Sequence, residues 1–136
     1  MAWIKSKPGL WHALTDAPQP AATAIANYVA WMRGLDGEPV FTAHPPAMDG
    51  PWIDHYLKRF AGLRLLKGPS ALTRLFHDGG MCLCSFAAGR LRRPFRLCAP
   101  EYYDPAWLGG HSHTHKAIDD ARGYAALLSH FLRDNP

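Results

Sequence analysis

The segment from His111 to Ala125 reads HSHTHKAIDDARGYA, and it indicates both the closing helix of the fold and most of the visible chemistry. Three histidines alternate with hydroxyl or basic residues, and two acids then open an amphipathic segment. Apolar residues recur at helical spacing, which predicts a helix over about residues 115–133. The stripe expected to be buried on this helix consists of Ile118, Ala121, Ala125, Leu128 and Leu132.

The two acids at the start of this helix have different expected surroundings. Asp119 projects roughly opposite the apolar stripe, into water, whereas Asp120 lies at the edge of the stripe. A carboxylate held against an apolar core is costly unless a partner compensates its charge. We therefore expect a partner for Asp120 and none for Asp119, with Thr114 capping the helix.

The remaining patterns predict a mixture of helices and strands. Helices are expected over residues 21–33 and 49–61, and short strands over 39–43 and 81–86. The expected buried stripe of the first helix is Ile25, Tyr28, Val29 and Met32. The expected buried stripe of the second helix is Trp52, Ile53, Tyr56, Leu57 and Phe60.

Composition indicates one folded domain that spans residues 1–136. With 48% hydrophobic and 19% charged residues, the 136-residue chain does not have the composition of a disordered protein. Its three cysteines are an odd number without a secretory signal, which favours reduced thiols in the cytoplasm. No apolar run approaches the roughly 18 residues of a membrane span, so no membrane is expected among its partners.

Positive charge is concentrated in the middle of the chain. Nine bases and one acid lie between Lys58 and Arg96, although the whole chain carries only +4. Such a segment suits a polyanion, and the alternative is a solvated basic surface. Bases interleaved with aromatics can contact phosphates and stack on nucleobases, unless the aromatics merely cover a core. The candidate nucleic-acid-binding residues are Arg90, Arg92, Arg93, Tyr102 and Tyr103.

Three residues could together perform metal-assisted hydrolysis. Asp49 is expected on the buried side of the first turn of its helix, where an N-cap role is the alternative. Two acids on different helices, Asp49 and Asp120, could share a magnesium or manganese ion, because hard cations prefer oxygen ligands. His115 could accept the proton of a metal-bound water. This combination describes attack of water on a phosphodiester.

The same residues lie in two segments that resemble a known family. The run AHPPAMDGPW at residues 43–52 resembles the second motif of DEDDh 3′–5′ exonucleases, the superfamily of ribonuclease T and the polymerase proofreading subunit. The run HKAIDDA at residues 115–121 resembles their third motif, and the resemblance extends from about Ala21 to the C-terminus.

This resemblance implies an α/β, ribonuclease H-like fold and a metal-dependent 3′–5′ exonuclease. It implies Asp49 and Asp120 as ligands of Mg²⁺ or Mn²⁺, His115 as the general base, and no direct role for Asp119. The implied substrate is the 3′ end of single-stranded RNA or DNA.

The chain departs from the family at the first motif, an Asp-x-Glu on an opening strand, which we do not find. We expect the first antiparallel strands of the sheet to be missing. Two divalent cations carry four positive charges against the two negative charges of Asp49 and Asp120, so two-metal binding should be weak. The chain alone is expected to be weakly active or inactive. It is either a fragment or a remnant that forms a homodimer or rearranges.

Two other functions remain open. The chain could be a non-catalytic relative that binds nucleic acid or a partner through its basic middle. Alternatively, His111, His113 and His115 could bind zinc, because alternate residues of an extended strand share one face. A flexible, solvated histidine loop is the simpler explanation of that spacing.

Overall fold

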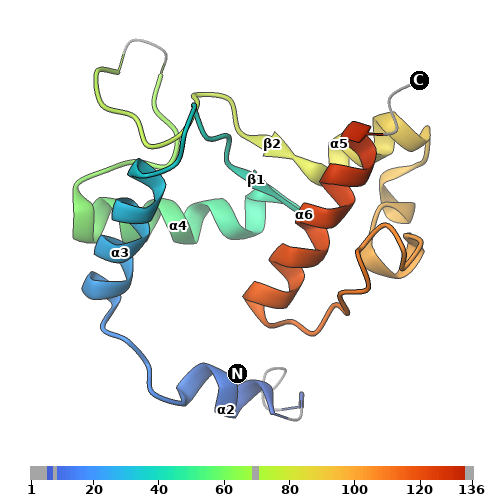
Figure 1. Cartoon of the computed structure of the whole chain (residues 1–136), viewed down its shortest axis with the longest axis horizontal. Coiled ribbons are helices and arrows are strands. Elements are labelled where there is room, and N and C mark those ends of the chain that lie inside the picture. The colour runs from blue at the N-terminus through green and yellow to red at the C-terminus, as the bar shows by residue number, and fades with distance from the viewer. Residues whose placement is uncertain (1–5, 8, 69–70, 134–136) are drawn as a thin grey trace. The chain divides into compact units, whose positions relative to one another are not determined.

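The structure of the chain, a computed structural model, describes residues 6–7, 9–68 and 71–133 (Figure 1). These residues form a mixed α/β arrangement that is mostly helical, with one two-stranded sheet. This confirms the α/β class. The helices and strands in chain order are α2 (Leu10–Thr15), α3 (Ala21–Arg33), β1 (Thr42–Ala43), α4 (Pro46–Ala61), β2 (Met81–Cys82), α5 (Leu83–Leu91) and α6 (Ala117–Arg133). Two short 3₁₀ turns, η1 (Phe95–Leu97) and η2 (Pro100–Tyr102), lie between α5 and α6.

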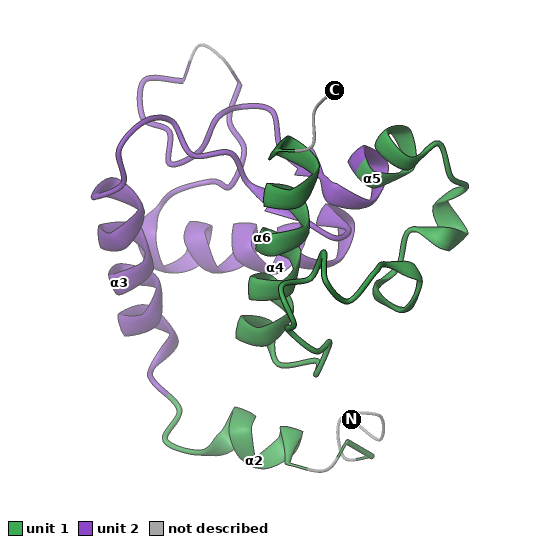
Figure 2. Cartoon of the chain, turned by 45° about the vertical axis from the view of Figure 1, so that its right-hand side comes forward, with its two compact units in different colours: residues 1–18, 87–136 green, residues 19–86 purple. Residues whose placement is uncertain are grey.

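The chain divides into two compact units, which Figure 2 distinguishes by colour. Unit 1 comprises Met1–Pro18 and Ala87–Pro136, so it contains α6 and the segment that leads into it. Unit 2 is the continuous stretch Gln19–Phe86, which contains α3, α4 and the sheet. No helix among the described residues has the length and apolar character needed to cross a membrane.

Helix α3 packs on α4 to form the core of unit 2. The predicted bounds of α3 are confirmed, as is its predicted inner side: Val29 and Met32 are buried, with Ile25 and Tyr28 packed against the same cluster. Leu57 of α4 has no exposed surface and lies at the centre of this core. The other buried members of the core are Leu65, Leu75 and Phe76.

The sheet is shorter than predicted. β1 and β2 pair in parallel, with Thr42 opposite Met81 and Ala43 opposite Cys82. Parallel strands need a crossover connection, and α4 lies in the one between them. The predicted strand over residues 81–86 is wrong after Cys82, because the backbone N–H of Ser85 donates to Cys82 Sγ and α5 begins at Leu83.

Helix α4 begins three residues earlier than predicted, and this changes the position of Asp49. The helix starts at Pro46, so Asp49 is inside the first turn and is not the N-cap. Asp49 is exposed, which makes the prediction of an inward-facing carboxylate wrong. The buried residue is instead its neighbour Gly50, which lies about 100° further around the helix. Trp52 was expected to be buried but is 67% exposed.

The buried side of α6 also differs from the predicted stripe. The buried residues are Gly123, Leu127 and Phe131, whereas Ile118 is 58% exposed. The loop before α6 lies against this side of the helix. A Cβ at Gly123 would lie 3.6 Å from the Cβ of His111, and a Cβ at Gly109 would lie only 3.1 Å from the Cβ of Ala126. Periodicity identified a helix with an apolar side but selected the wrong side.

Candidate metal centre at the start of α6

The segment before α6 folds back onto the first turn of the helix. The backbone N–H groups of Thr114 and His115 donate to Oδ1 of Asp120 at 3.0 and 3.3 Å. The hydroxyl of Thr114 donates to Oδ2 of Asp119 at 2.8 Å and accepts the N–H of Lys116 at 3.2 Å. His115 adopts a left-handed backbone conformation, with φ of 65°, and this reverses the chain.

These bonds test the predictions for the two acids. Asp120 has the partners that its position required, namely two backbone N–H groups and an imidazole. The prediction that Asp119 faces water is wrong, because Asp119 is half-buried and accepts the Thr114 hydroxyl. The reason is the side of α6 that is buried: Asp119 lies four residues before Gly123, on the same side of the helix.

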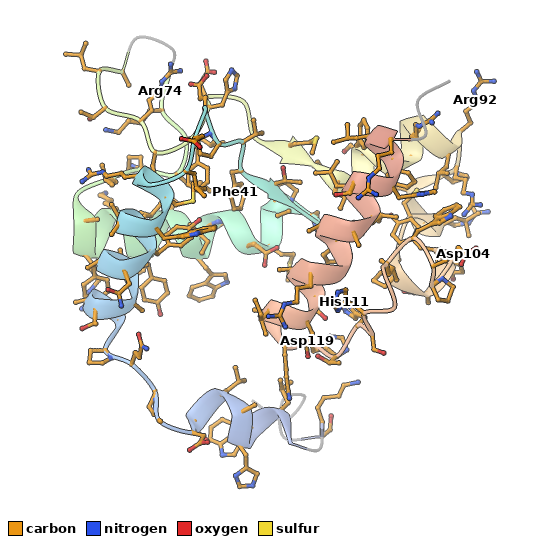
Figure 3. The ribbon with its side chains drawn as sticks, in the orientation of Figure 1. Phe41, Arg74, Arg92, Asp104, His111 and Asp119 are labelled. Carbon is orange, nitrogen blue, oxygen red and sulfur yellow. The ribbon has the colours of Figure 1, made fainter. Side chains whose placement is uncertain are left out.

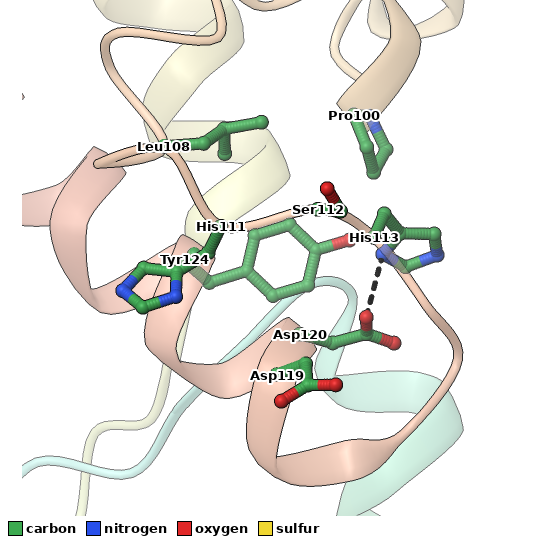
Figure 4. A pocket seen from close by; sticks show the side chains of 9 residues that line it. Pro100, Leu108, His111, Ser112, His113, Asp119, Asp120 and Tyr124 are labelled. Atoms are coloured by element: carbon green, nitrogen blue, oxygen red, sulfur yellow. Dashed lines mark ion pairs between the residues drawn. The ribbon is translucent and has the colours of Figure 1, made fainter.

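Three side chains converge at this turn. Single ligand atoms of His113, His115 and Asp120 all lie within 4.8 Å of one another. Nδ1 of His113 lies 3.1 Å from Oδ1 of Asp120, the pair joined by the dashed line in Figure 4. The two imidazole rings are 4.5 Å apart at an angle of 76°. His113 and Asp120 therefore form an ion pair whenever the imidazole is protonated, and the three together offer two nitrogens and a carboxylate to an ion.

A small hollow opens beside this group, entirely within unit 1. His111 and Asp119, both labelled in Figure 3, are among the residues that line it. The other side chains or backbones that line it are Pro100, Leu108, Ser112, His113, Asp120, Gly123 and Tyr124. The hollow thus presents two carboxylates and two imidazoles to a ligand.

The predicted site residues are divided between the two units. His115 and Asp120 come together in unit 1. Asp49 belongs to unit 2, where it is an exposed residue of α4. His115 was placed in the helix but precedes it, since α6 starts at Ala117.

The predicted nucleic-acid contacts all lie in unit 1, but they differ in accessibility. Arg92 is exposed, whereas Arg93 is half-buried and donates from its guanidinium to the Tyr102 carbonyl at 3.2 Å. Arg90 is also half-buried. Tyr102 is 49% exposed and can stack on a base. Tyr103 is 5% exposed, so the prediction that it stacks on a base is wrong; its ring covers the core.

A wider cleft of about 360 Å³ lies in unit 2, but its charged groups neutralise one another. The charged residues in its wall are Asp54 and Arg64, joined by a contact of 2.7 Å between Oδ2 and a guanidinium nitrogen. The hydrogen bond from Arg64 holds the pKa of Asp54 below its ordinary value. The one acid and the one base in the wall of this cleft are therefore paired with each other.

The role of His113 was misjudged from the sequence. The alternating histidines grouped His113 with His111 and His115 on an extended strand, but the chain turns at Gly109 and Gly110 and again at His115. His111 is consequently outside the cluster, and Asp120 takes its place. The spacing of seven residues between His113 and Asp120 did not indicate the pair, because His113 precedes α6 and only Asp120 lies on the helix.

Comparison with known proteins identifies no relative of this chain. The chain matches no protein-family model, no curated protein and no solved structure.

Proposed function

We propose that this chain is a metal-dependent hydrolase that cleaves phosphodiester bonds at the 3′ end of single-stranded RNA or DNA. The observation that carries the proposal is the meeting of His115 and Asp120 at the start of α6. In this proposal Asp120 binds Mg²⁺ or Mn²⁺ through its carboxylate, and His115 accepts a proton from the attacking water.

The environment of Asp120 supports its role as a ligand. The two backbone N–H groups donate to Oδ1 and so orient the carboxylate before a metal arrives. The side chain is 18% exposed, which leaves a path from solvent.

Unit 1 also contains side chains that suit a polyanionic substrate. Unit 1 contains the exposed Arg92 and the exposed ring of Tyr102 together with the pair. A guanidinium can contact phosphates and an aromatic ring can stack on an unpaired base. The ribonuclease H-like fold is part of the proposal, and the parallel β1–α4–β2 crossover supports it.

The test is the digestion of a single-stranded oligonucleotide labelled at its 5′ end, with Mg²⁺ or Mn²⁺ present. We expect a ladder of products shortened from the 3′ end, which a chelator abolishes. Asp120→Asn and His115→Asn should each lower the rate by at least about 100-fold, the range attributed to general acid–base groups. Asn at position 115 tolerates the left-handed backbone, so this variant should fold.

Asp119→Asn is the matched control, because it removes the same charge one residue away and should retain the rate of the unchanged chain. If the oligonucleotide stays intact with either metal, the proposal is wrong. If it is bound but not cut, and binding survives Asp120→Asn, the chain is a non-catalytic nucleic-acid-binding protein instead.

A further inference from the structure

The donor atoms at the start of α6 have a composition that magnesium does not prefer. His113 and His115 supply imidazole nitrogens, and Asp120 supplies a carboxylate oxygen. Imidazole suits zinc and the later first-row metals, whereas magnesium favours oxygen. Three protein ligands with a fourth position left for water is a common arrangement at zinc sites. We propose that His113, His115 and Asp120 bind one Zn²⁺ ion.

The distances between the ligand atoms of these residues allow zinc to bind with little rearrangement. In a tetrahedral zinc site with bonds of about 2.0–2.1 Å, neighbouring donors lie roughly 3.3 Å apart. Nδ1 of His113 and Oδ1 of Asp120 are already 3.1 Å apart, and no pair within the group exceeds 4.8 Å. The His113 side chain is 32% exposed, so rotation of its imidazole can close the remaining distance.

The backbone holds one of the ligands, Asp120, in place before the ion binds. The N–H groups of Thr114 and His115 fix the Asp120 carboxylate. The Thr114 hydroxyl ties the same loop to Asp119, whose carboxylate adds a second negative charge beside the group. An ion that replaces the His113–Asp120 pairing would thus find a preorganised site, which lowers the cost of binding.

This inference goes beyond the proposed hydrolase, because it requires no substrate. It has one consequence for that function. An imidazole bound to Zn²⁺ has no lone pair for a proton, so zinc occupancy and the proposed role of His115 as general base exclude one another.

The test is the affinity of the metal-free full-length chain for Zn²⁺ alone, measured by competition with a zinc-binding dye. We expect one ion per chain. His113→Ala, His115→Asn and Asp120→Asn should each weaken binding by at least about tenfold. Far-ultraviolet circular dichroism on each variant checks that the helices persist.

A matched control keeps the proposal falsifiable. His111→Ala removes an imidazole from the same loop and should not change the affinity by more than about twofold. No binding of Zn²⁺ by the chain would overturn the inference. So would an equal loss with His111→Ala, which would assign the ion to His111, His113 and His115 instead. Neither result bears on cleavage with Mg²⁺, so the two proposals can fail separately.

Discussion

The pairing of Asp54 with Arg64 makes a residue-scale prediction about stability and pH. Besides the ion pair, Nε of Arg64 and the N–H of Leu65 both donate to Oδ1 of Asp54, at 2.8 and 2.9 Å. The bond from Arg64 is the main reason that the pKa of Asp54 lies below its ordinary value. The folded state therefore binds this proton less readily than the unfolded chain does.

The stabilisation from Asp54 should be fully present above its unfolded pKa of about 3.9 and should be lost as the pH falls through its lower folded pKa. We expect Asp54→Asn to lower the free energy of unfolding in urea at pH 7 and to have a smaller effect at pH 3. A difference between the two chains that stays constant from pH 7 to pH 3 would contradict the assigned pKa direction.

Residue-scale chemistry was partly predictable. The need of Asp120 for a partner follows from its position beside an apolar face, and the structure supplies one. The separate environment of Asp119 was not predictable, because it depends on the Thr114 hydroxyl and on a left-handed residue at His115. Left-handed conformations of residues other than glycine leave no reliable pattern in a sequence.

At the scale of elements, α6 provides a direct test of which side of the helix is buried. Leu127 has no exposed surface, whereas Leu132 on the same helix is 62% exposed. We expect Leu127→Ala to lower the free energy of unfolding by about 2–5 kcal/mol. The matched change Leu132→Ala should have an effect within about 0.5 kcal/mol.

Denaturant unfolding of both variants makes this comparison. If Leu132→Ala lowers the free energy of unfolding more than Leu127→Ala does, the stripe predicted from periodicity is the buried side of α6, and the side described above is contradicted. Helical spacing alone could not decide this, because α6 has apolar residues on both sides. In the structure, the loop that carries His111 lies against α6 at Gly123, on the same side of the helix as Leu127.

The elements themselves were predicted unevenly. Helix α3 has the predicted bounds, because Pro20 precedes it and Gly34 ends it. The predicted strand over residues 81–86 failed, since a short apolar run fits a buried strand and a buried helix equally well. Here Leu83 and Ala87, four residues apart, are both fully buried, as on one side of a helix.

At the scale of the whole molecule, the basic middle of the chain is less uniformly available than its composition suggests. Arg64 is paired with Asp54, and Arg74 with Glu38 and Asp78. Arg92, in contrast, is exposed. Charge counting located the segment correctly, but it could not identify which bases already have acidic partners.

Because Arg64 is paired and Arg92 is exposed, two variants that lose the same charge should change the salt dependence of nucleic-acid binding unequally. Arg92→Gln should reduce the slope of log affinity against log salt for single-stranded RNA or DNA by about 0.7, the contribution of one phosphate contact. Arg64→Gln should leave the slope unchanged. Fluorescence anisotropy at several salt concentrations measures both, and equal slopes for the two variants would contradict the proposed contact at Arg92.

The claim shared by the proposed function and by the further inference is that a divalent ion binds where the loop meets α6. The most direct measurement is residue-resolved NMR of the full chain during titration with Mn²⁺, which broadens the signals of nearby nuclei and accepts both oxygen and imidazole ligands. The account predicts that the signals of residues 113–120 broaden first and that Asp120→Asn abolishes this selectivity. Broadening that is uniform along the chain, or centred elsewhere, would contradict the account.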